Sequence, residues 1–287
     1  MDSTALARLR ETQNADGGWG YFPGKQSWLE PTVYAAAALK GESAADRAWA
    51  LLKTWQGADG GWKPAANVPL PGWGTSLCVS LAQSRGDFGE PFQQGVEWLV
   101  GTREMRPPLW QRALFRTGQF GEYRDFSIDG WPWRDGQVSW VEPNVHGIVA
   151  LRQASLKQTS AKLEDRVRMA QAQLIESRCP DFGWNYGRSR TLGYALVAFE
   201  ETTGLALIGL QGHADLEKSL ALAETMARGT VSPLARAWLT IALKLHGREV
   251  PQSQGRIAAT PEITVLALGA LAEHYPEFFR MGAAATT

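Results

Sequence analysis

The sequence has little cysteine and no excess of charge of either sign. Two cysteines, Cys78 and Cys179, occur in 287 residues. This number excludes a framework of several disulfide bonds and favours a reducing compartment, so we expect a cytoplasmic protein. Lysine and arginine together number 29, as do aspartate and glutamate, and the formal net charge is zero. A neutral chain lacks the basic surplus typical of nucleic-acid-binding proteins, and we expect no nucleic-acid partner.

Long apolar runs and a targeting signal are lacking as well. The longest apolar run covers residues 263–272, whereas a membrane-spanning helix needs roughly 18 apolar residues. We therefore expect no transmembrane segment, which leaves peripheral contact with a membrane open. Residues 1–4 do not begin the basic stretch and apolar core of a signal peptide.

Common catalytic and metal-binding signatures are also missing. The chain has no Gly-x-Ser-x-Gly motif, no Walker loop, no dinucleotide fingerprint and no His-Glu-x-x-His. Its four histidines are far apart in the sequence and form no cluster with the two cysteines. Because metal sites need such ligands at close spacing, we expect neither a metal ion nor another cofactor.

Tryptophan, by contrast, is abundant, with 13 residues, and it recurs in a repeated motif. Asp-Gly-Gly-Trp occupies residues 16–19 and 59–62, and shorter versions end at Trp131 and Trp184. A shift of 112 residues also matches a longer stretch without gaps. It pairs Gly18, Trp19, Gly24, Ser27, Trp28, Glu30 and Pro31 with Gly130, Trp131, Gly136, Ser139, Trp140, Glu142 and Pro143. Such repetition is typical of folds built from repeated units.

Helical patterns separate the tryptophan turns, and strand-like alternation is nearly absent. We expect about eleven helices. Those at residues 31–39, 143–151, 201–210 and 262–272 are apolar on nearly all sides, which predicts complete burial. The helices between them carry one charged face. An inner ring of buried helices inside an outer ring of amphipathic ones satisfies both patterns. The sequence therefore predicts an all-α fold, a single α/α toroid domain over residues 1–287, rather than an open superhelical solenoid.

The tryptophan turns carry a resemblance to a known family. Residues 13–20, Gln-Asn-Ala-Asp-Gly-Gly-Trp-Gly, resemble the Gln–Trp repeat of squalene-hopene and oxidosqualene cyclases, and residues 55–62 are a second copy. Residues 181–187 and 201–207 are similar to the C-terminal part of those cyclases. Protein prenyltransferase β-subunits share the barrel. Physically, a Gln side chain can bond the backbone of the next helix while the indole is buried, so we expect Trp19, Trp62, Trp131 and Trp184 to be structural.

The resemblance implies a terpene cyclase-like protein without a second domain. Full-length cyclases have a second helical domain, and their active cavity lies between the two. It follows that this toroid binds or transforms an apolar isoprenoid ligand in its own mouth, or that a homodimer or a partner chain supplies the missing wall. The Asp-x-Asp-Asp acid motif of those cyclases is absent. Glu142 lies where the central aspartate would be, so any cyclase-like reaction would use a glutamate.

Glu30 and Glu142 occupy equivalent repeat positions, each directly before a proline that begins a predicted inner helix. One interpretation is that both carboxylates cap their helices or pair with arginine. The other is that they converge on one mouth of the toroid, resist ionisation, and act as acid or base. His146 lies one helical turn after Glu142, as a proton relay or as a satisfied core residue. The candidate catalytic residues are thus Glu142, Glu30 and His146, and the candidate ligand-binding residues are Trp28, Trp140, Tyr34 and Trp133.

Residues 103–138 form an irregular stretch that is long enough for a functional or lid loop. It combines Asp125, Asp129 and Asp135 with aromatic residues (Phe120, Tyr123, Phe126, Trp131 and Trp133), which resembles the sugar-binding clefts of α/α-toroid glycosidases and lyases. A carbohydrate-active enzyme and a non-catalytic interaction scaffold are therefore the alternatives. The lining of the pocket distinguishes them, since apolar aromatic walls favour an isoprenoid, added polar groups favour a sugar, and a filled centre favours a scaffold.

Overall fold

The structure, a computed structural model, describes residues 2–105, 108–117, 128–158, 160–191, 194–254 and 259–282. These residues form twelve α-helices, one 3-10 helix and one two-stranded hairpin. The helices are α1 (Asp2–Glu11), α2 (Leu29–Ala38), α3 (Ser43–Thr54), α4 (Gly74–Arg85), α5 (Glu90–Gly101), α6 (Leu109–Arg116), α7 (Val141–Ser155), α8 (Ala161–Glu176), α9 (Glu200–Gly209), α10 (Glu217–Gly229), α11 (Pro233–Leu245), α12 (Ile263–His274) and the 3-10 helix η1 (Pro276–Phe279). Strands β1 (Arg190–Thr191) and β2 (Tyr194–Ala195) pair antiparallel.

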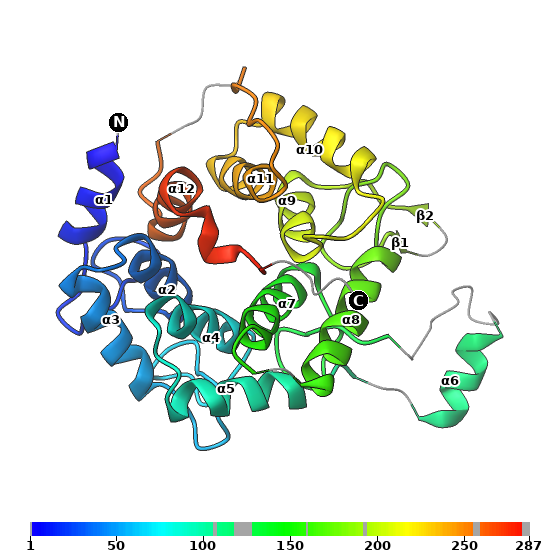
Figure 1. Ribbon diagram of the computed structural model, residues 1–287, viewed down its shortest axis with the longest axis horizontal. Coiled ribbons are helices and arrows are strands. Elements are labelled where there is room, and N and C mark those ends of the chain that lie inside the picture. Colours follow the sequence, from blue (N-terminus) through cyan, green and yellow to red (C-terminus); the bar gives the residue numbers. More distant parts are fainter. Residues whose placement is uncertain are drawn as a thin grey trace.

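Six helices close into an inner ring. Going round the ring, α2 packs against α4, then α7, α9, α11 and α12 follow, and α12 returns to α2 (Figure 1). Helices α3, α5, α8 and α10 pack on the outside of this ring, and α1 covers α12. The architecture is an α/α toroid, which confirms the predicted all-α fold class.

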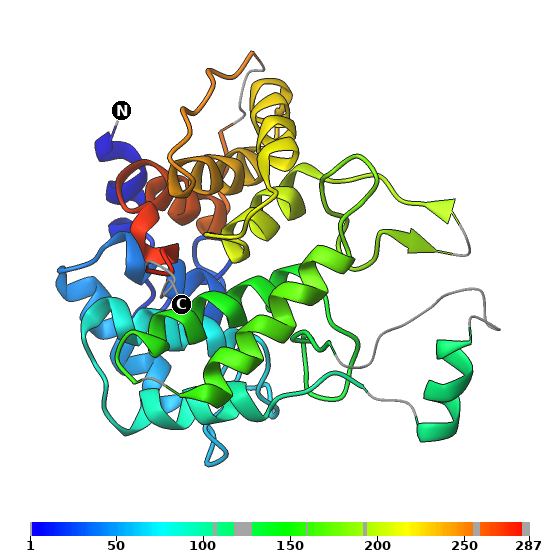
Figure 2. The same cartoon turned by 45° about the vertical axis from the view of Figure 1, so that its right-hand side comes forward.

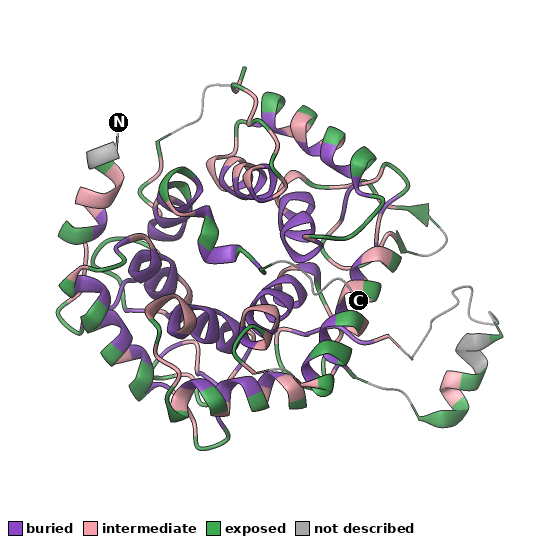
Figure 3. Ribbon diagram, in the orientation of Figure 1, coloured by how far each residue is buried: buried purple, intermediate pink, exposed green. Residues whose placement is uncertain are grey.

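The burial of each helix follows its predicted place in the two rings. Helices α2, α4, α7 and α9 are buried along nearly their whole length, whereas the outer helices are buried only on the side that faces the ring (Figure 3). The outer helix α8, for example, buries Leu163, Val167 and Leu174 and leaves its other side to solvent. Apolar side chains on every face of an inner helix thus lie between two layers of helices.

Each tryptophan turn joins one outer helix to the inner helix that follows it. The indole N–H of Trp19 donates to the Leu9 carbonyl at the end of α1 (2.8 Å), and its backbone N–H donates to Thr32 Oγ1 in α2 (2.9 Å). Trp62 repeats both bonds with the Leu52 carbonyl and with Thr75 Oγ1. The repeated sequence therefore produces a repeated pattern of hydrogen bonds.

The glutamine of each motif connects its turn to the next outer helix. Gln56 Nε2 donates to the carbonyls of Gly60 (2.9 Å) and of Pro91 in α5 (2.8 Å). Gly60 has a φ of +88° and lies against the backbone of Gln94, so the turn needs a residue without a Cβ. Gln13 makes the equivalent pair of bonds to Gly17 and to Ala44 in α3.

Three elements were not predicted from the sequence: α6, the β1–β2 hairpin and η1. Helix α6 lies within the irregular stretch 103–138, of which Phe120, Tyr123, Asp125 and Phe126 are outside the described residues. Figure 1 shows α6 apart from the ring. No helix in the described part of the chain is long and apolar enough to cross a membrane.

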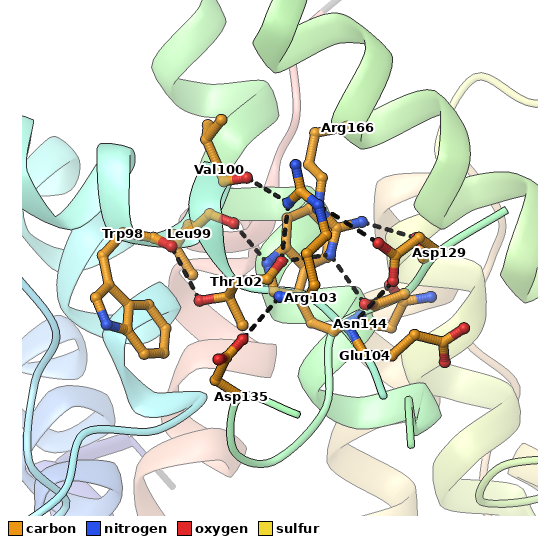
Figure 4. A network of polar contacts seen from close by, with 12 residues as sticks. Trp98, Leu99, Val100, Thr102, Arg103, Glu104, Asp129, Asp135, Asn144 and Arg166 are labelled. Carbon is orange, nitrogen blue, oxygen red and sulfur yellow. Dashed lines mark hydrogen bonds and ion pairs between the residues drawn. The ribbon is translucent and has the colours of Figure 1, made fainter. Parts of the chain in front are cut away.

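Arg166 of α8 ties the beginning of the 103–138 stretch to residues 129–130 further along it (Figure 4). Its guanidinium is buried, donates to the carbonyls of Asp129 (2.7 Å), Gly130 (2.9 Å) and Thr102 (3.2 Å), and lies 3.8 Å above the ring of Trp131. The chain therefore leaves and re-enters the toroid at one point, and the position of this point does not depend on α6.

The 3-10 helix η1 closes one end of the ring. Gln153 near the end of α7 donates to the Phe278 carbonyl (2.7 Å), and Gln211 after α9 donates to the Phe279 carbonyl (2.9 Å). These glutamines lie at the carboxyl ends of inner helices, so η1 lies at the end of the toroid opposite to where those helices begin. The mouth at the amino-terminal end of the inner helices is therefore where a ligand site would be expected.

Candidate functional site

Four carboxylates gather at the mouth where the inner helices begin. Glu30, Glu142 and Glu201 lie in the first turns of α2, α7 and α9, and Glu262 is the N-cap residue of α12. Their charges interact across the ring: Glu142 is affected by Glu30 and Glu201, and Glu30 by Glu262. The structure thus brings Glu30 and Glu142 together at one mouth.

Glu30 is held by a tyrosine. The Tyr21 hydroxyl donates to Glu30 Oε2 over 2.7 Å. Burial raises the pKa of Glu30 to about 7, with a further contribution from the charge of Glu262, while the hydrogen bond from Tyr21 acts in the opposite direction. Burial and the Glu30 charge in turn raise the pKa of Tyr21, so this hydroxyl stays protonated and remains a donor.

The carboxyl group of Glu142 has fewer polar contacts than that of Glu30. Burial, together with the charges of Glu30 and Glu201, raises the pKa of Glu142 to about 8. Among the described residues, its carboxyl has no hydrogen bond and no ion pair. The N-cap residues of α2 and α7 are Trp28 and Trp140, and no side chain caps either helix. Within the described chain, neither glutamate therefore caps its helix or pairs with an arginine.

Sequence reasoning missed the other two carboxylates of the mouth. The Tyr186 hydroxyl donates to Glu201 Oε2 over 3.4 Å. Burial raises the pKa values of both Glu201 and Glu262. A signal was present, because these glutamates begin the predicted inner helices 201–210 and 262–272, just as Glu30 and Glu142 precede the helical prolines.

An aromatic pocket with a volume of about 270 Å³ opens beside Glu30. Its walls include Tyr21, Trp28, Trp73 and Trp133, with Leu70 among the apolar residues of the 64–74 loop. The rings of Trp73 and Trp133 meet edge to face with centroids 5.1 Å apart. The backbone N–H of Trp73 donates to the Trp133 carbonyl (3.0 Å). This bond fixes one wall of the pocket to the chain segment that re-enters the toroid before α7. Trp73 and Tyr21 were not among the sequence candidates.

Two predicted site residues lie deeper, at the centre of the ring. The Tyr34 hydroxyl is 3.2 Å from His146 Nε2, and both residues are buried. They pack with Trp238 and Phe279, whose ring centroids lie about 6 Å from that of Tyr34. Burial lowers the pKa of His146 to about 3, so the imidazole is neutral. The centre of the toroid is therefore filled, and neither Tyr34 nor His146 lines the pocket.

Of the three remaining candidate residues, two line the pocket and one does not. Trp28 and Trp133 line the pocket. Trp140 does not: it is 38% exposed and lies beside Gly187 on the outside of the mouth. Trp28, by contrast, packs against Tyr21 of the pocket wall, with ring centroids 6.0 Å apart.

The acidic residues proposed for a sugar cleft have structural contacts where they are described. Asp129 is buried, its side chain accepts the Glu104 N–H (3.2 Å), and it pairs with Arg103 (3.6 Å). Asp135 accepts the Arg103 N–H (2.9 Å), as Figure 4 shows. Asp125 lies outside the described residues. In the part of the chain that the structure covers, no three His, Cys, Asp or Glu side chains are placed to hold a metal ion.

No protein-family model and no curated protein matches this sequence. Solved structures do match its fold. The type II terpene cyclase MstE from Scytonema is 20% identical with a TM-score of 0.53, and the match covers 95% of this chain and 76% of that one. The endo-beta-1,4-glucanase CMCax from Acetobacter xylinum is 12% identical with a TM-score of 0.60, covering 95% and 97%. A protein from Actinoplanes is 18% identical with a TM-score of 0.56, covering 96% and 100%. These likenesses show the α/α-toroid fold.

Proposed function

We propose that the mouth of this toroid binds an apolar ligand of the isoprenoid type and presents it to the carboxyl groups of Glu30 and Glu142. The observation that carries the proposal is the composition of the pocket. Four indoles (Trp28, Trp62, Trp73 and Trp133) and one phenol surround a space with apolar loop residues on its other side, and Glu30 and Arg134 are the charged residues within its lining. Aromatic walls with few, placed polar groups are typical of sites for apolar small molecules.

The protonation states of the glutamates limit the chemistry. With pKa values of about 8 and about 7, Glu142 is mostly protonated near neutral pH and Glu30 is protonated about half of the time. A protonated carboxyl donates a hydrogen bond and transfers a proton to a moderately basic oxygen, but it is a weak acid toward an alkene. The site therefore favours recognition of a polar group on an otherwise apolar ligand. If it transforms the ligand in a terpene cyclase-like reaction, Glu142 is the proposed acid.

The fold neighbours are compatible with this ligand class. The terpene cyclase MstE has been solved in complex with geranylgeranyl dihydroxybenzoate as substrate, a molecule with an isoprenoid chain and a polar head. A homodimer or a partner chain that covers the mouth would complete the enclosure of such a ligand, and we propose this as the counterpart of the second domain of larger cyclases.

Titration with farnesol and geranylgeraniol tests the proposal, with intrinsic tryptophan fluorescence as the readout. Binding should quench the pocket indoles, and Trp73→Ala should weaken it by about tenfold or more because one wall is lost. Trp110→Ala, which changes an exposed tryptophan on α6, is the matched control and should leave the affinity unchanged. Native mass spectrometry of the purified protein, followed by organic extraction, would identify a bound lipid directly. Saturable binding that Trp73→Ala does not weaken would contradict the pocket assignment.

A carbohydrate ligand is the second candidate, and the four carboxylates beside aromatic rings favour it. Glycosidases use a pair of carboxyl groups flanking the scissile bond. A parallel arm of the same experiment uses cello-oligosaccharides: binding or hydrolysis that is lost in Glu142→Gln, with no response to prenols, would replace the isoprenoid proposal. The filled centre around Tyr34 and His146 fits a scaffold, which predicts no response in either arm.

A further inference from the structure

Among the described residues, the outer ring of the toroid is one helix short of the inner ring. Outer helices α1, α3, α5, α8 and α10 precede the inner helices α2, α4, α7, α9 and α11. Residues 246–262, which connect α11 to α12, contain no helix in the part that the structure describes. Figures 1 and 2 show α10 on one side of the α11–α12 junction and α1 on the other. In the described chain, the outer side of this junction therefore lacks the helix that the other junctions have.

A groove with a volume of about 600 Å³ lies at this junction, and we call it the α11–α12 groove. Its lining on α11 recurs every three or four residues along one face of the helix, at Pro233, Ala237, Thr240 and Lys244. This face is about 16 Å long at the rise of an α-helix. On α12 the lining extends from Val265 to His274. A groove of this length between two helices has the shape that a third helix fills.

Gly269, in the middle of α12, shows that the α11–α12 groove is open. The residue is exposed, and a Cβ at this position would meet no atom within 4 Å. Glycines of other inner helices face occupied space. A Cβ at Gly209 of α9 would lie 3.0 Å from Leu174 of the outer helix α8, and one at Gly147 of α7 would lie 2.4 Å from Trp131. At Gly269, α12 thus leaves room for another side chain.

Thr264 shows independently that the repeat unit before α12 is incomplete. Two residues after a mouth glutamate, Thr32, Asn144 and Thr203 each accept the backbone N–H of a turn tryptophan, over 2.9, 3.2 and 3.1 Å. Thr264 follows Glu262 at the same spacing, but residues 246–262 contain no tryptophan. Its Oγ1 is buried and has no hydrogen-bond partner among the described residues. Buried hydroxyls are normally paired, so α12 keeps the acceptor of a complete unit without its donor.

The α11 side of the groove is basic. Arg236 and Lys244 line it, eight residues or about 12 Å apart along the helix. Their hydrogen bonds in the described chain run to backbone carbonyls and not to a carboxylate. The acidic residue of the lining, Glu273, lies on α12 at 3.8 Å from His274. An occupant with carboxyl groups about two helical turns apart would therefore complement the charges of α11.

We propose that the α11–α12 groove docks an amphipathic helix of a partner protein, which takes the place of the absent outer helix. This helix presents small apolar side chains to the groove and two carboxylates to Arg236 and Lys244. The chain's own outer helix α10 has this composition. It buries Ser219, Leu220, Ala223 and Ala227 against the ring and carries Glu217 and Glu224 seven residues apart.

The charges of the groove favour such a partner over a second copy of this chain. Helix α6 is the helix of this chain that lies apart from the ring (Figure 1). Its sequence, Leu-Trp-Gln-Arg-Ala-Leu-Phe-Arg, has two arginines and no acidic residue. Two arginines beside Arg236 and Lys244 would repel each other, so α6 of a second copy is a poor occupant.

A synthetic peptide of α10, residues 216–229, is the probe that tests the groove. A staple between the exposed positions 221 and 225 holds it helical, because so short a helix is marginal in water. Fluorescence anisotropy of the labelled peptide with the full chain should show saturable one-to-one binding. Replacing Glu217 and Glu224 of the peptide by lysine should weaken binding by about tenfold or more, since the charges then repel.

Gly269→Leu fills the groove from α12 and should weaken binding of the parent peptide by about tenfold or more. Its melting temperature should not fall, because the new side chain enters open space and glycine is a poor helix former. Thr240→Arg repeats the test from α11. Gly101→Leu is the matched control: this glycine ends α5, is exposed and has equally open space around it, and the variant should bind the peptide like the unaltered chain.

The proposal is overturned if the peptide does not bind, or if the lysine peptide binds as well as the parent. It is also overturned if Gly269→Leu and Gly101→Leu bind alike, which would mean that the peptide exchanges with the chain's own α10. A dimer of the chain alone that Gly269→Leu dissolves, seen by size-exclusion chromatography, would make a second copy the occupant instead. Farnesol binding should be the same in Gly269→Leu, so this test is independent of the pocket beside Glu30.

Discussion

The Tyr34 hydroxyl and His146 Nε2 lie 3.2 Å apart at the centre of the ring, although 112 residues separate them in the sequence. The same offset relates Glu30 to Glu142. Each half of the repeat therefore carries a carboxyl at the mouth and, one helical turn deeper, a polar ring. The repeat brings both pairs together, one as neighbouring charges and the other as a hydrogen bond.

Tyr34→Phe should destabilise the protein by about 1–3 kcal/mol, because it removes the partner of a buried imidazole nitrogen and leaves that nitrogen without water. Urea unfolding at neutral pH measures the loss. Tyr275→Phe is the control, since the Tyr275 hydroxyl accepts a bond from Lys40 in an exposed position. Equal losses in the two variants would mean that the Tyr34–His146 contact contributes nothing specific.

Trp62→Ala should cost on the order of 3–5 kcal/mol, as the removal of a large buried aromatic side chain does. The Trp62 side chain is fully buried, and its indole N–H bonds the end of the preceding helix. Trp110→Ala on α6 removes the same side chain from an exposed position and should change stability by less than about 0.5 kcal/mol. A Trp62→Ala protein that kept its melting temperature would show that the turn is held by something other than the indole.

The toroid was predictable because its signals are periodic and local. Apolar residues on every face of α2 predict that this helix is buried. The repeated turns at Trp19 and Trp62 predict how an outer helix is joined to the next inner helix. Neither prediction requires knowledge of distant contacts. Helix α6 was not predictable in the same way. It has eight residues and lies within the stretch 103–138, whose prolines, glycines and aspartates are typical of irregular structure.

The site was predictable only in part, for a geometric reason. Repeat position identified Glu30 and Glu142, and the structure places them at one mouth. Repeat position alone could not show that Tyr34 and His146 face the filled centre. That depends on η1, which enters the ring from the C-terminal end of the chain. Trp73 was missed because it precedes α4, where no glutamate accompanies it.

Arg166→Lys should destabilise the protein by about 2–4 kcal/mol. A lysine keeps the charge but cannot reach three carbonyls at once or stack flat on Trp131, so buried acceptors lose their donors. Thermal unfolding compares it with Arg168→Lys, two residues further along α8, where the side chain is exposed. A loss no greater than that of the control would remove Arg166 as the tie at the base of the 103–138 stretch.

Glu142→Gln should stabilise the protein at alkaline pH and leave it nearly unchanged at acidic pH. In the unfolded chain this carboxyl ionises near its ordinary pKa of 4.5, whereas in the folded chain its pKa is about 8. Between these values the folded state holds a proton that the unfolded state has lost, so the unfolding free energy falls as pH rises through this window. Glutamine does not titrate, and the variant removes this part of the loss.

Urea unfolding from about pH 5 to about pH 9 measures the effect, and the gain at the alkaline end should be about 1–3 kcal/mol. The slope should decrease without vanishing, because burial also raises the pKa of Glu30, to about 7. Glu97→Gln, at an exposed position on α5, should leave the whole profile unchanged. If Glu142→Gln ran parallel to the unaltered chain at every pH, Glu142 would be ionised in the folded protein at neutral pH. It could then neither donate a hydrogen bond to a ligand nor serve as the acid of the mouth.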